Sequence, residues 1–300
     1  MSASFANALA AAHEAAGSQN HPASTLYVVA TPIGNLADIS LRALHVLARV
    51  DVVACEDTRH TQQLLRAYGL DRPGSQLLAV HQHNEAEAAR NVLERLGQGQ
   101  RVAYVSDAGT PAISDPGARL VAAVRQAGFR VMPLPGASSV TTALSASGMT
   151  GDHGFVFAGF LPSKATERQM AVQHLAQESR AVVLLEAPHR IEALAQALAV
   201  LGKRPITLGR ELTKQFEQIE TLPAQDLSAW LAEKPERLRG EFVLVLHDAP
   251  VDDATGEGLR VLQLLLPELP LKTAVKLAAE ISGESKNTLY EQALALKNQG

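Results

Sequence analysis

"RVAYVSDAGTPAISDPGARLVAAVRQAGFRVMPLPGASS", residues 101–139, contains the unit that decides the fold. An apolar, β-branched run over 101–106 leads into a loop rich in glycine, proline and small residues. A stretch with helical spacing of apolar residues follows, and a second apolar run covers 129–134. A strand, a helix and a second strand in this order predict a βα unit of a parallel sheet.

The loop of this unit is longer than a connection requires. Asp115 is a plausible N-cap, Pro116 suits the first helical position, and Gly128 marks the end of the helix. The preceding stretch, residues 107–113, has no such local role, although ordinary βα loops need only a few residues. We therefore expect this stretch to contact a ligand.

The same alternation runs through the whole first half of the chain. Further strands are expected over 26–30, 51–55 and 77–80. One helix should follow Ser40, and another should begin at Asn84 with a capping box to Glu87 and end at Gly97. Strands and helices at this spacing predict an open parallel sheet.

Four of the expected βα loops are unusually rich in glycine, proline and small hydroxyl residues. In an open parallel sheet, ligands bind beyond the carboxyl ends of the strands. Glycine and proline there let backbone groups approach a ligand closely. The chain has neither G-x-G-x-x-G after its first strand nor G-x-x-x-x-G-K-[ST], which favours a ligand without a large phosphate. The loops are 31–38, 56–61, 106–117 and 133–139.

The second half of the chain has a different organisation. Residues 147–154 form a turn-rich linker, and strands are expected in "FVFAGF", "AVVLLEA", "PITLGRE" and "EFVLVLH". Residues 212–222 alternate and could pair antiparallel, which predicts a mixed sheet. Beyond residue 250 the pattern is helical, and "SGES" joins two helices in a helix-turn-helix arrangement. We expect a flexible tail over 1–23, α/β domains over 24–148 and 149–249, and a helical extension over 250–300.

Composition narrows the class of protein. The 300 residues are 46% hydrophobic with a net charge of −4, which argues against coating nucleic acid non-specifically. No apolar run is long enough to span a bilayer, and the N-terminal stretch lacks a basic start. Cys55 is the single cysteine, so it forms no internal disulfide or multi-cysteine metal site, and its apolar surroundings predict a buried, inert thiol. We expect a cytoplasmic protein without a metal site, binding neither membrane nor DNA.

Several long motifs occur in an order typical of one family. These motifs resemble the bacterial 16S ribosomal RNA cytidine 2′-O-methyltransferases, a branch of the tetrapyrrole-methylase-like class of S-adenosylmethionine-dependent methyltransferases. The resemblance extends over about 26–247, and "TPIGNLAD" replaces the glycine-rich loop of tetrapyrrole methylases. It implies two α/β domains with the donor cleft between them and a helix-turn-helix-like extension. The motifs include "TPIGNLADISLRALHVLARVDVVACEDTRH", "VAYVSDAGTPAISDPG", "PLPGASS", "FAGFLPSK", "LLEAPHRI", "RELTKQFE" and "GEFVLVL".

The resemblance also implies a donor site built from both α/β domains. S-adenosylmethionine would contact the small-residue loops of the first domain and strand ends of the second. The first-domain residues are Pro32, Gly34, Asp107, Ala108, Gly109, Thr110, Ile113, Pro135, Gly136 and Ser138. The second-domain residues are Leu185, Glu186, Ala187, Arg210 and Glu211.

The implied acceptor is a cytidine ribose in the decoding region of 16S RNA, within the 30S subunit. A ribose hydroxyl is a poor nucleophile at neutral pH, so a general base should help. Glu56, Asp57 and Glu186 are the candidates, with His83 as a further one, although Asp57 could simply cap a helix. RNA affinity depends on phosphate contacts, for which the motif loops offer basic side chains. These are Arg59, His60, Lys164, Arg168, Arg190 and Lys214, each of which alone could be a solvated surface charge.

Two other functions remain open at this point. The same fold and donor could serve methylation of a tetrapyrrole or another small molecule, although the "TPIGNLAD" loop and the added helices argue against it. The chain could also be a ribosome-binding module without turnover. The class generally forms dimers, so a homodimer is expected, and the nearly neutral C-terminal helices could mediate its contacts.

Overall fold

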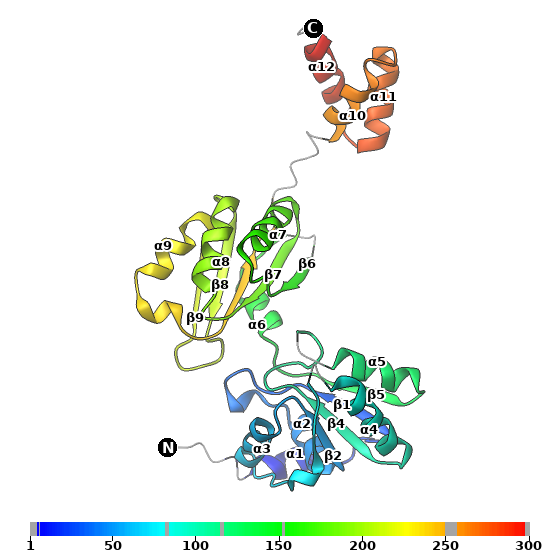
Figure 1. The fold of residues 1–300 in the computed structure, drawn as a ribbon, viewed down its shortest axis with the longest axis vertical. Coiled ribbons are helices and arrows are strands. Elements are labelled where there is room, and N and C mark those ends of the chain that lie inside the picture. Colours follow the sequence, from blue (N-terminus) through cyan, green and yellow to red (C-terminus); the bar gives the residue numbers. More distant parts are fainter. Residues whose placement is uncertain are drawn as a thin grey trace. The chain divides into compact units, whose positions relative to one another are not determined.

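The computed structural model describes residues 5, 7–81, 84–114, 117–151, 154–249 and 257–297. Residues 1–247 form one compact unit and residues 248–300 a second. The first unit contains two five-stranded sheets, and the second is helical (Figure 1). The predicted fold class is therefore confirmed.

The first sheet is entirely parallel, with the strand order β3-β2-β4-β1-β5. Every strand lies where the sequence predicted it, within one or two residues. Successive side chains of a strand point to opposite faces of the sheet, and here both sets are apolar. Helices therefore cover both faces. The strands are β1 (Thr25–Val29), β2 (Val52–Cys55), β3 (Leu77–Ala79), β4 (Arg101–Val105) and β5 (Arg130–Leu134).

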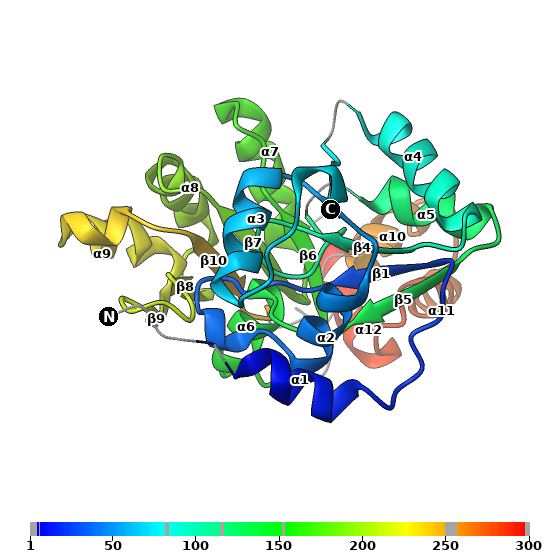
Figure 2. The same ribbon diagram turned by 90° about the horizontal axis from the view of Figure 1, so that it is seen from below.

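The connecting helices divide between the two faces of this sheet. On one face α2 (Leu41–Arg49) and α3 (Thr58–Ala67) pack against Tyr27 and Val29. On the other face α4 (Glu85–Gly97) and α5 (Ala118–Gln126) pack against Leu26 and Tyr104. Figure 2 shows α4 and α5 side by side, with α1 and α2 together at the other side of the sheet.

The helix starts follow the sequence only in part. Ser40 Oγ accepts a hydrogen bond from Ala43 N at 3.1 Å, as an N-cap should. The capping box expected at Asn84 is wrong, because Asn84 Oδ1 accepts from His81 N at 2.8 Å and so closes the turn after β3. Asp115 and Pro116, expected to start α5, lie outside the described residues. Gly117 occupies the residue before α5 with φ +118°, a conformation that favours glycine.

Part of the expected flexible tail is an ordered helix. Helix α1 (Ala8–Ala16) packs on α2 and buries Ala12 and Ala16. The ring of Phe5 meets the edge of Tyr68 with centroids 5.3 Å apart. The small side chains of Ala12 and Ala16, four residues apart, allow α1 to pack on α2. This spacing is a sequence signal for a helix within the expected tail.

The second sheet is mixed, in the order β6-β7-β10-β8-β9. Strands β6 and β7 are parallel, whereas β10 and β9 pair antiparallel with their neighbours, as the alternation over 212–222 suggested. Helices α7 (Ala165–Gln177), α8 (Ile191–Leu198) and α9 (Leu227–Ala232) pack on one face. The strands are β6 (Phe155–Gly159), β7 (Ala181–Glu186), β8 (Pro205–Arg210), β9 (Gln218–Pro223) and β10 (Phe242–Leu246).

Helix α6 (Ser139–Ala146) lies before the linker but packs on this second sheet. Its Val140 and Ala143 contact a cluster that includes Val183 and Val243. The chain therefore begins to pack on the second sheet at α6, before the domain boundary expected at residue 148. Short 3-10 helices complete the unit: η1 (Leu36–Asp38), η2 (Gly74–Gln76), η3 (Ala199–Leu201), η4 (Ala224–Asp226) and η5 (Pro235–Leu238).

The C-terminal unit consists of α10 (Glu257–Leu265), α11 (Leu271–Ser282) and α12 (Lys286–Lys297). Its core is small, with Leu262, Ala278 and Leu289 fully buried. Helix α11 ends at Gly283, whose φ of +76° suits glycine and opens the turn to α12. The expected pair of helices joined by a short turn is confirmed. Among the described helices of the whole chain, none is long and apolar enough to cross a membrane.

Candidate functional site

Three of the predicted loops meet at the carboxyl edge of the first sheet. Thr31 and Gly109 exchange backbone hydrogen bonds of 2.9 and 3.0 Å, which join the loops after β1 and β4. Thr110 Oγ1 donates to Ala137 O at 3.0 Å and adds the loop after β5. A Cβ on Gly136 would come 2.9 Å from Ala30 Cβ, so glycine permits this approach. Three of the four loops expected to bind a ligand are therefore in direct contact with one another.

A pocket of about 400 Å³ opens between these loops, α3 and the second sheet. Four residues expected at the donor, Pro32, Gly34, Asp107 and Ala108, line it. His60 and Lys214, expected to bind RNA, line it as well. Sequence reasoning missed its remaining lining residues, Ile33, Leu36, Gln63, Leu64, Ala67 and Glu241.

A signal for part of the missed lining exists in the sequence. His60, Gln63, Leu64 and Ala67 are spaced i, i+3, i+4 and i+7, so they share one face of α3. Extending the helix pattern beyond "EDTRHT" would have identified them. Glu241 had no such signal, because it reaches the pocket only through the pairing of β10 with β8.

Asp57 and Asp107 are linked at the pocket's edge. Asp107 Oδ1 accepts a hydrogen bond from Asp57 N at 3.2 Å. The Asp57 carboxylate caps α3 by accepting from Arg59 N at 2.8 Å and His60 N at 3.3 Å. These backbone hydrogen bonds lower the pKa of Asp57, which makes it a weak base. The capping role anticipated for Asp57 is confirmed.

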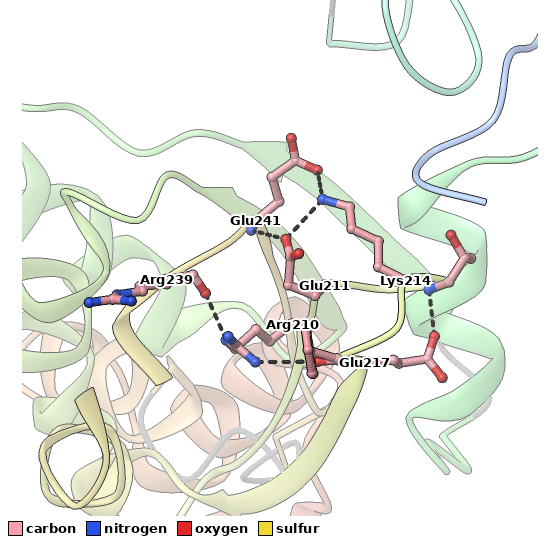
Figure 3. A network of polar contacts seen from close by, with 8 residues as sticks. Arg210, Glu211, Lys214, Glu217, Arg239 and Glu241 are labelled. Atoms are coloured by element: carbon pink, nitrogen blue, oxygen red, sulfur yellow. Dashed lines mark hydrogen bonds and ion pairs between the residues drawn. The ribbon is translucent and has the colours of Figure 1, made fainter. Parts of the chain in front are cut away.

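Lys214 lies between two carboxylates from neighbouring segments (Figure 3). Its Nζ contacts Glu211 Oε1 at 2.8 Å and Glu241 Oε2 at 3.1 Å. Burial favours neutral Lys214, but the hydrogen bonds and charges of both carboxylates outweigh it and raise its pKa. Burial likewise raises the pKa of Glu211, and bonds from Lys214 and the Glu241 N–H reverse that effect to a net lowering. Lys214 therefore stays protonated, as the centre of an ion-paired cluster with two carboxylates at the edge of the pocket.

Arg210 organises the backbone next to this cluster. Its Nε donates to Arg239 O at 2.7 Å (Figure 3). Its Nη1 donates to Phe216 O at 3.2 Å. The side chain is only 8% exposed. Arg210 thus holds the loop between β8 and β9 in shape, rather than reaching the pocket as a donor ligand.

Glu186 and Leu185 point to opposite faces of the second sheet. Leu185 packs in the cluster with Ile33 and Val243, on the face toward the first-domain loops. Glu186 lies on the face of Leu184, where α7 and α8 pack. Alternation along the strand imposes this difference, because a shift of one residue exchanges faces. Leu185 therefore faces the first-domain loops, and Glu186 faces the helices of its own domain.

Glu186 has a partner in its own domain. Its side chain is fully buried, Oε1 contacts Arg190 Nε at 3.0 Å, and the same oxygen accepts from Ala187 N at 2.9 Å. Arg190 also donates to the Leu161 carbonyl. Arg190 and Glu186 are therefore partners of each other, and neither lines the pocket.

The other basic side chains expected at RNA differ in placement. Arg59 lies in the first turn of α3, is 89% exposed and contacts the Asp57 carboxylate at 3.5 Å. Lys164 pairs with Glu167 at 3.0 Å, and Arg168 donates to Ser163 O at 3.0 Å, both at the start of α7. Only Arg59, His60 and Lys214 thus gather around the pocket and its helix.

The remaining predicted residues do not line this pocket. Ile113 is exposed, and Ser138 precedes α6 with no side-chain capping bond. Glu56 directly follows β2 and precedes the Asp57 cap. Pro135 and Ala187 follow β5 and β7, respectively. His83 lies outside the described residues.

The pocket residues fit S-adenosylmethionine in size and in chemistry. The volume lies in the range of small-molecule sites, and apolar Ile33 and Leu64 combine with the carboxylates of Asp107 and Glu241. A cationic donor with apolar parts suits this combination. No three His, Cys, Asp or Glu side chains within the described ranges are arranged to hold a metal ion.

Comparison with known proteins agrees with this geometry. The family model "Tetrapyrrole (Corrin/Porphyrin) Methylases" matches residues 25–228, and "RsmI C-terminal HTH domain" matches residues 252–297. Ribosomal RNA small subunit methyltransferase I of Escherichia coli O157:H7 is 49% identical over 273 residues, which cover 90% of this chain and 94% of that protein. The Pseudomonas aeruginosa protein of the same name is 49% identical over 278 residues, covering 91% and 97%.

Solved structures share the fold at low sequence identity. Uroporphyrin-III-C-methyltransferase from Thermus thermophilus aligns with a TM-score of 0.51 at 22% identity, over 75% of this chain and 94% of that one. Diphthine synthase aligns with a TM-score of 0.55 at 15% identity, over 74% and 90%. The chain therefore belongs to the tetrapyrrole methylase family, within the group of ribosomal RNA small subunit methyltransferase I proteins.

Proposed function

We propose that this protein transfers a methyl group from S-adenosylmethionine to the ribose 2′-hydroxyl of a cytidine in 16S ribosomal RNA. The observation that carries the proposal is the pocket that Gly34 and Asp107 of the first-domain loops line together with Lys214 of the second domain. Relatives named ribosomal RNA small subunit methyltransferase I, at 49% identity over most of the chain, support it. We place the reaction on the 30S subunit, in the cytoplasm, and expect a homodimer.

The donor would be held mainly by the first-domain loops. S-adenosylmethionine supplies a methyl group already activated on its sulfonium sulfur. Pro32, Gly34 and Ala108 offer small walls and backbone groups, and Asp107 offers a carboxylate held in place by Asp57 N. Leu185 would add apolar contact from the second sheet. The loop contacts of Gly109, Thr110 and Gly136 keep these walls together.

The chain's own contribution to the reaction is mainly alignment. Because the methyl is activated, holding the acceptor oxygen in line with it supplies most of the acceleration. Exposed Arg59 would attract the RNA phosphates, and His60 lies next to it in the pocket lining. Of the three acids predicted as general bases, Glu56 remains the candidate, since Asp57 caps α3 and Glu186 is paired on the opposite face.

The test is transfer of labelled methyl from the donor to three acceptors. The protein is incubated with 30S subunits, naked 16S RNA or uroporphyrinogen, and the label is then mapped. Label on a cytidine ribose of 30S subunits is expected. Label on uroporphyrinogen alone would instead indicate a small-molecule methyltransferase, and donor binding without transfer to any acceptor would indicate a ribosome-binding module.

A general base is tested separately in the same assay. Glu56→Gln is expected to lower kcat while donor binding, measured by calorimetry, stays unchanged. Near-normal turnover of Glu56→Gln would show that alignment alone accounts for catalysis. Light scattering on the purified chain tests the expected homodimer.

A further inference from the structure

Phe216 projects into solvent from the loop between β8 and β9. Its exposure is 69%, more than that of any other described aromatic side chain. Leaving a phenyl group in water forfeits the hydrophobic stabilisation that burial would bring. Single exposed apolar side chains are common on protein surfaces, so what distinguishes Phe216 is its place next to the pocket region.

The loop that carries Phe216 is held in one conformation. Arg210 Nη1 donates to the Phe216 carbonyl at 3.2 Å, and Glu217 Oε2 accepts from Thr213 N at 2.5 Å. Glu211 and Thr213 have φ of +51° and +67°, values that are uncommon outside glycine. Such conformations persist only where surrounding contacts impose them, and they gather at functional sites. The ring is therefore presented from a rigid base.

The chain just before Phe216 lines the pocket region. A second hollow of about 650 Å³ shares Gly34, Leu36 and Ala67 with the pocket. Lys214 lines both hollows, and Gln215 lines the second. We call the region that these two hollows line the groove; Gln215, the residue preceding Phe216, belongs to the lining of the second hollow.

We propose that Phe216 is the stacking platform for an unpaired base of the acceptor RNA, at or next to the nucleotide that is methylated. The inference rests on the proposed function. A ribose inside a stacked helix is difficult to align, whereas single-stranded nucleotides are bound by stacking their bases on aromatic side chains. Lys214, two residues earlier, is held between the carboxylates of Glu211 and Glu241, so Phe216 would bind the nucleotide through its base rather than through a phosphate. Phe216 would thus select an exposed, splayed nucleotide.

The test compares substitutions at Phe216 with a matched surface phenylalanine. Phe155 lies at the start of β6, is 47% exposed and has no part in the groove. Phe216→Ala is expected to raise KM for 30S subunits about tenfold, the size expected for loss of one base–aromatic stack, with kcat and donor affinity little changed. Phe216→Tyr should restore the wild-type KM, Phe216→Leu should not, and Phe155→Ala should match wild type.

A spectroscopic measurement distinguishes stacking from a merely structural role. The tryptophan of Phe216→Trp should lose fluorescence when the RNA substrate binds, because a base then covers the indole, whereas Phe155→Trp should not. An unchanged KM of Phe216→Ala, or equal KM values for the Leu and Tyr variants, would overturn the platform. A third outcome would show that Phe216 contacts a second copy of the chain instead. In that case light scattering would show that Phe216→Ala no longer forms a dimer, and its raised KM would return to the wild-type value at high protein concentration. If the wild-type protein methylates 30S subunits, the proposed function stands whatever the Phe216 variants do. If the wild-type protein does not methylate 30S subunits, both the proposed function and the platform are overturned.

Discussion

Lys214 lies directly against Gly34. A Cβ at position 34 would come 2.4 Å from Lys214 Cγ, so the alkyl stem of the lysine occupies the space that any other side chain would need. At the far end of that stem, Nζ bridges Glu211 and Glu241. This contact joins the loop after β1 to the loop after β8, and with them the two sheets.

Gly34→Ala should therefore displace Lys214 and separate it from its carboxylates. We expect kcat/KM to fall about 10- to 100-fold, because small misplacements at an aligned site are costly. Steady-state methylation of 30S subunits measures it. Gly74→Ala is the control, since nothing lies within 4 Å of a Cβ there. A Gly34→Ala enzyme with wild-type kcat/KM would mean that the contact is dispensable.

Replacing Glu186 should affect stability more than chemistry. Glu186→Ala leaves the guanidinium of Arg190 without its partner in a mostly buried position. Loss of one member of a buried pair costs about 3 kcal/mol, which urea unfolding would detect. A Glu186→Gln variant that stays folded should keep most of its kcat. Strong loss of kcat with unchanged unfolding free energy would return Glu186 to the catalytic group.

Acidification should loosen the N-terminal helix α1. The ring centroid of His45 lies 4.9 Å from that of His21 and 5.6 Å from that of His13. Burial lowers the pKa of both His21 and His45 below 6.5, and the positive charge of Arg49 adds to this effect. For His21, Arg42 and Arg101 contribute as well, against a raising hydrogen bond to Gln19.

Because both histidine pKa values are lowered in the folded chain, the free energy of unfolding should fall as the pH falls. Below pH 6.5 the unfolded chain takes up protons before the folded one, so stability present above that pH declines as pH falls through the folded pKa values. Urea unfolding between about pH 7 and pH 5 should show this loss, at about 1.4 kcal/mol per unit of pKa difference. His21→Gln combined with His45→Gln should flatten the profile. An equally steep profile in the double variant would place the acid sensitivity elsewhere.

The thiol of Cys55 should be unreactive in the folded protein. Cys55 is fully buried, and burial raises its pKa to about 11, so almost no thiolate exists near neutral pH. Iodoacetamide at about pH 8 should leave the native chain unlabelled and label it fully in urea. Rapid native labelling detected by mass spectrometry would show that β2 opens locally.

Prediction from sequence succeeded where a property depends on neighbours along the chain. The β-branched run at 101–105 and the alternation near 218–223 set strand positions, since the period of the apolar pattern decides which backbone form buries it. The predicted capping box at Asn84 was wrong. The Asn84 side chain could either cap α4 or accept a hydrogen bond from the preceding turn, and it accepts from His81 N. Motif resemblance supplied the family and the loops of the site.

Contacts between distant segments were decided only by the tertiary structure. Strand pairing turns Leu185 toward the first-domain loops and Glu186 away from them, although the two are adjacent in sequence. No local pattern states that Lys214 will lie on Gly34, about 180 residues earlier. The sequence by itself thus determined the elements, the family and the small-residue loops, because these follow from local periodicity and motif. Sheet register and packing decided which side chains meet in the pocket, because only they bring distant residues to one place.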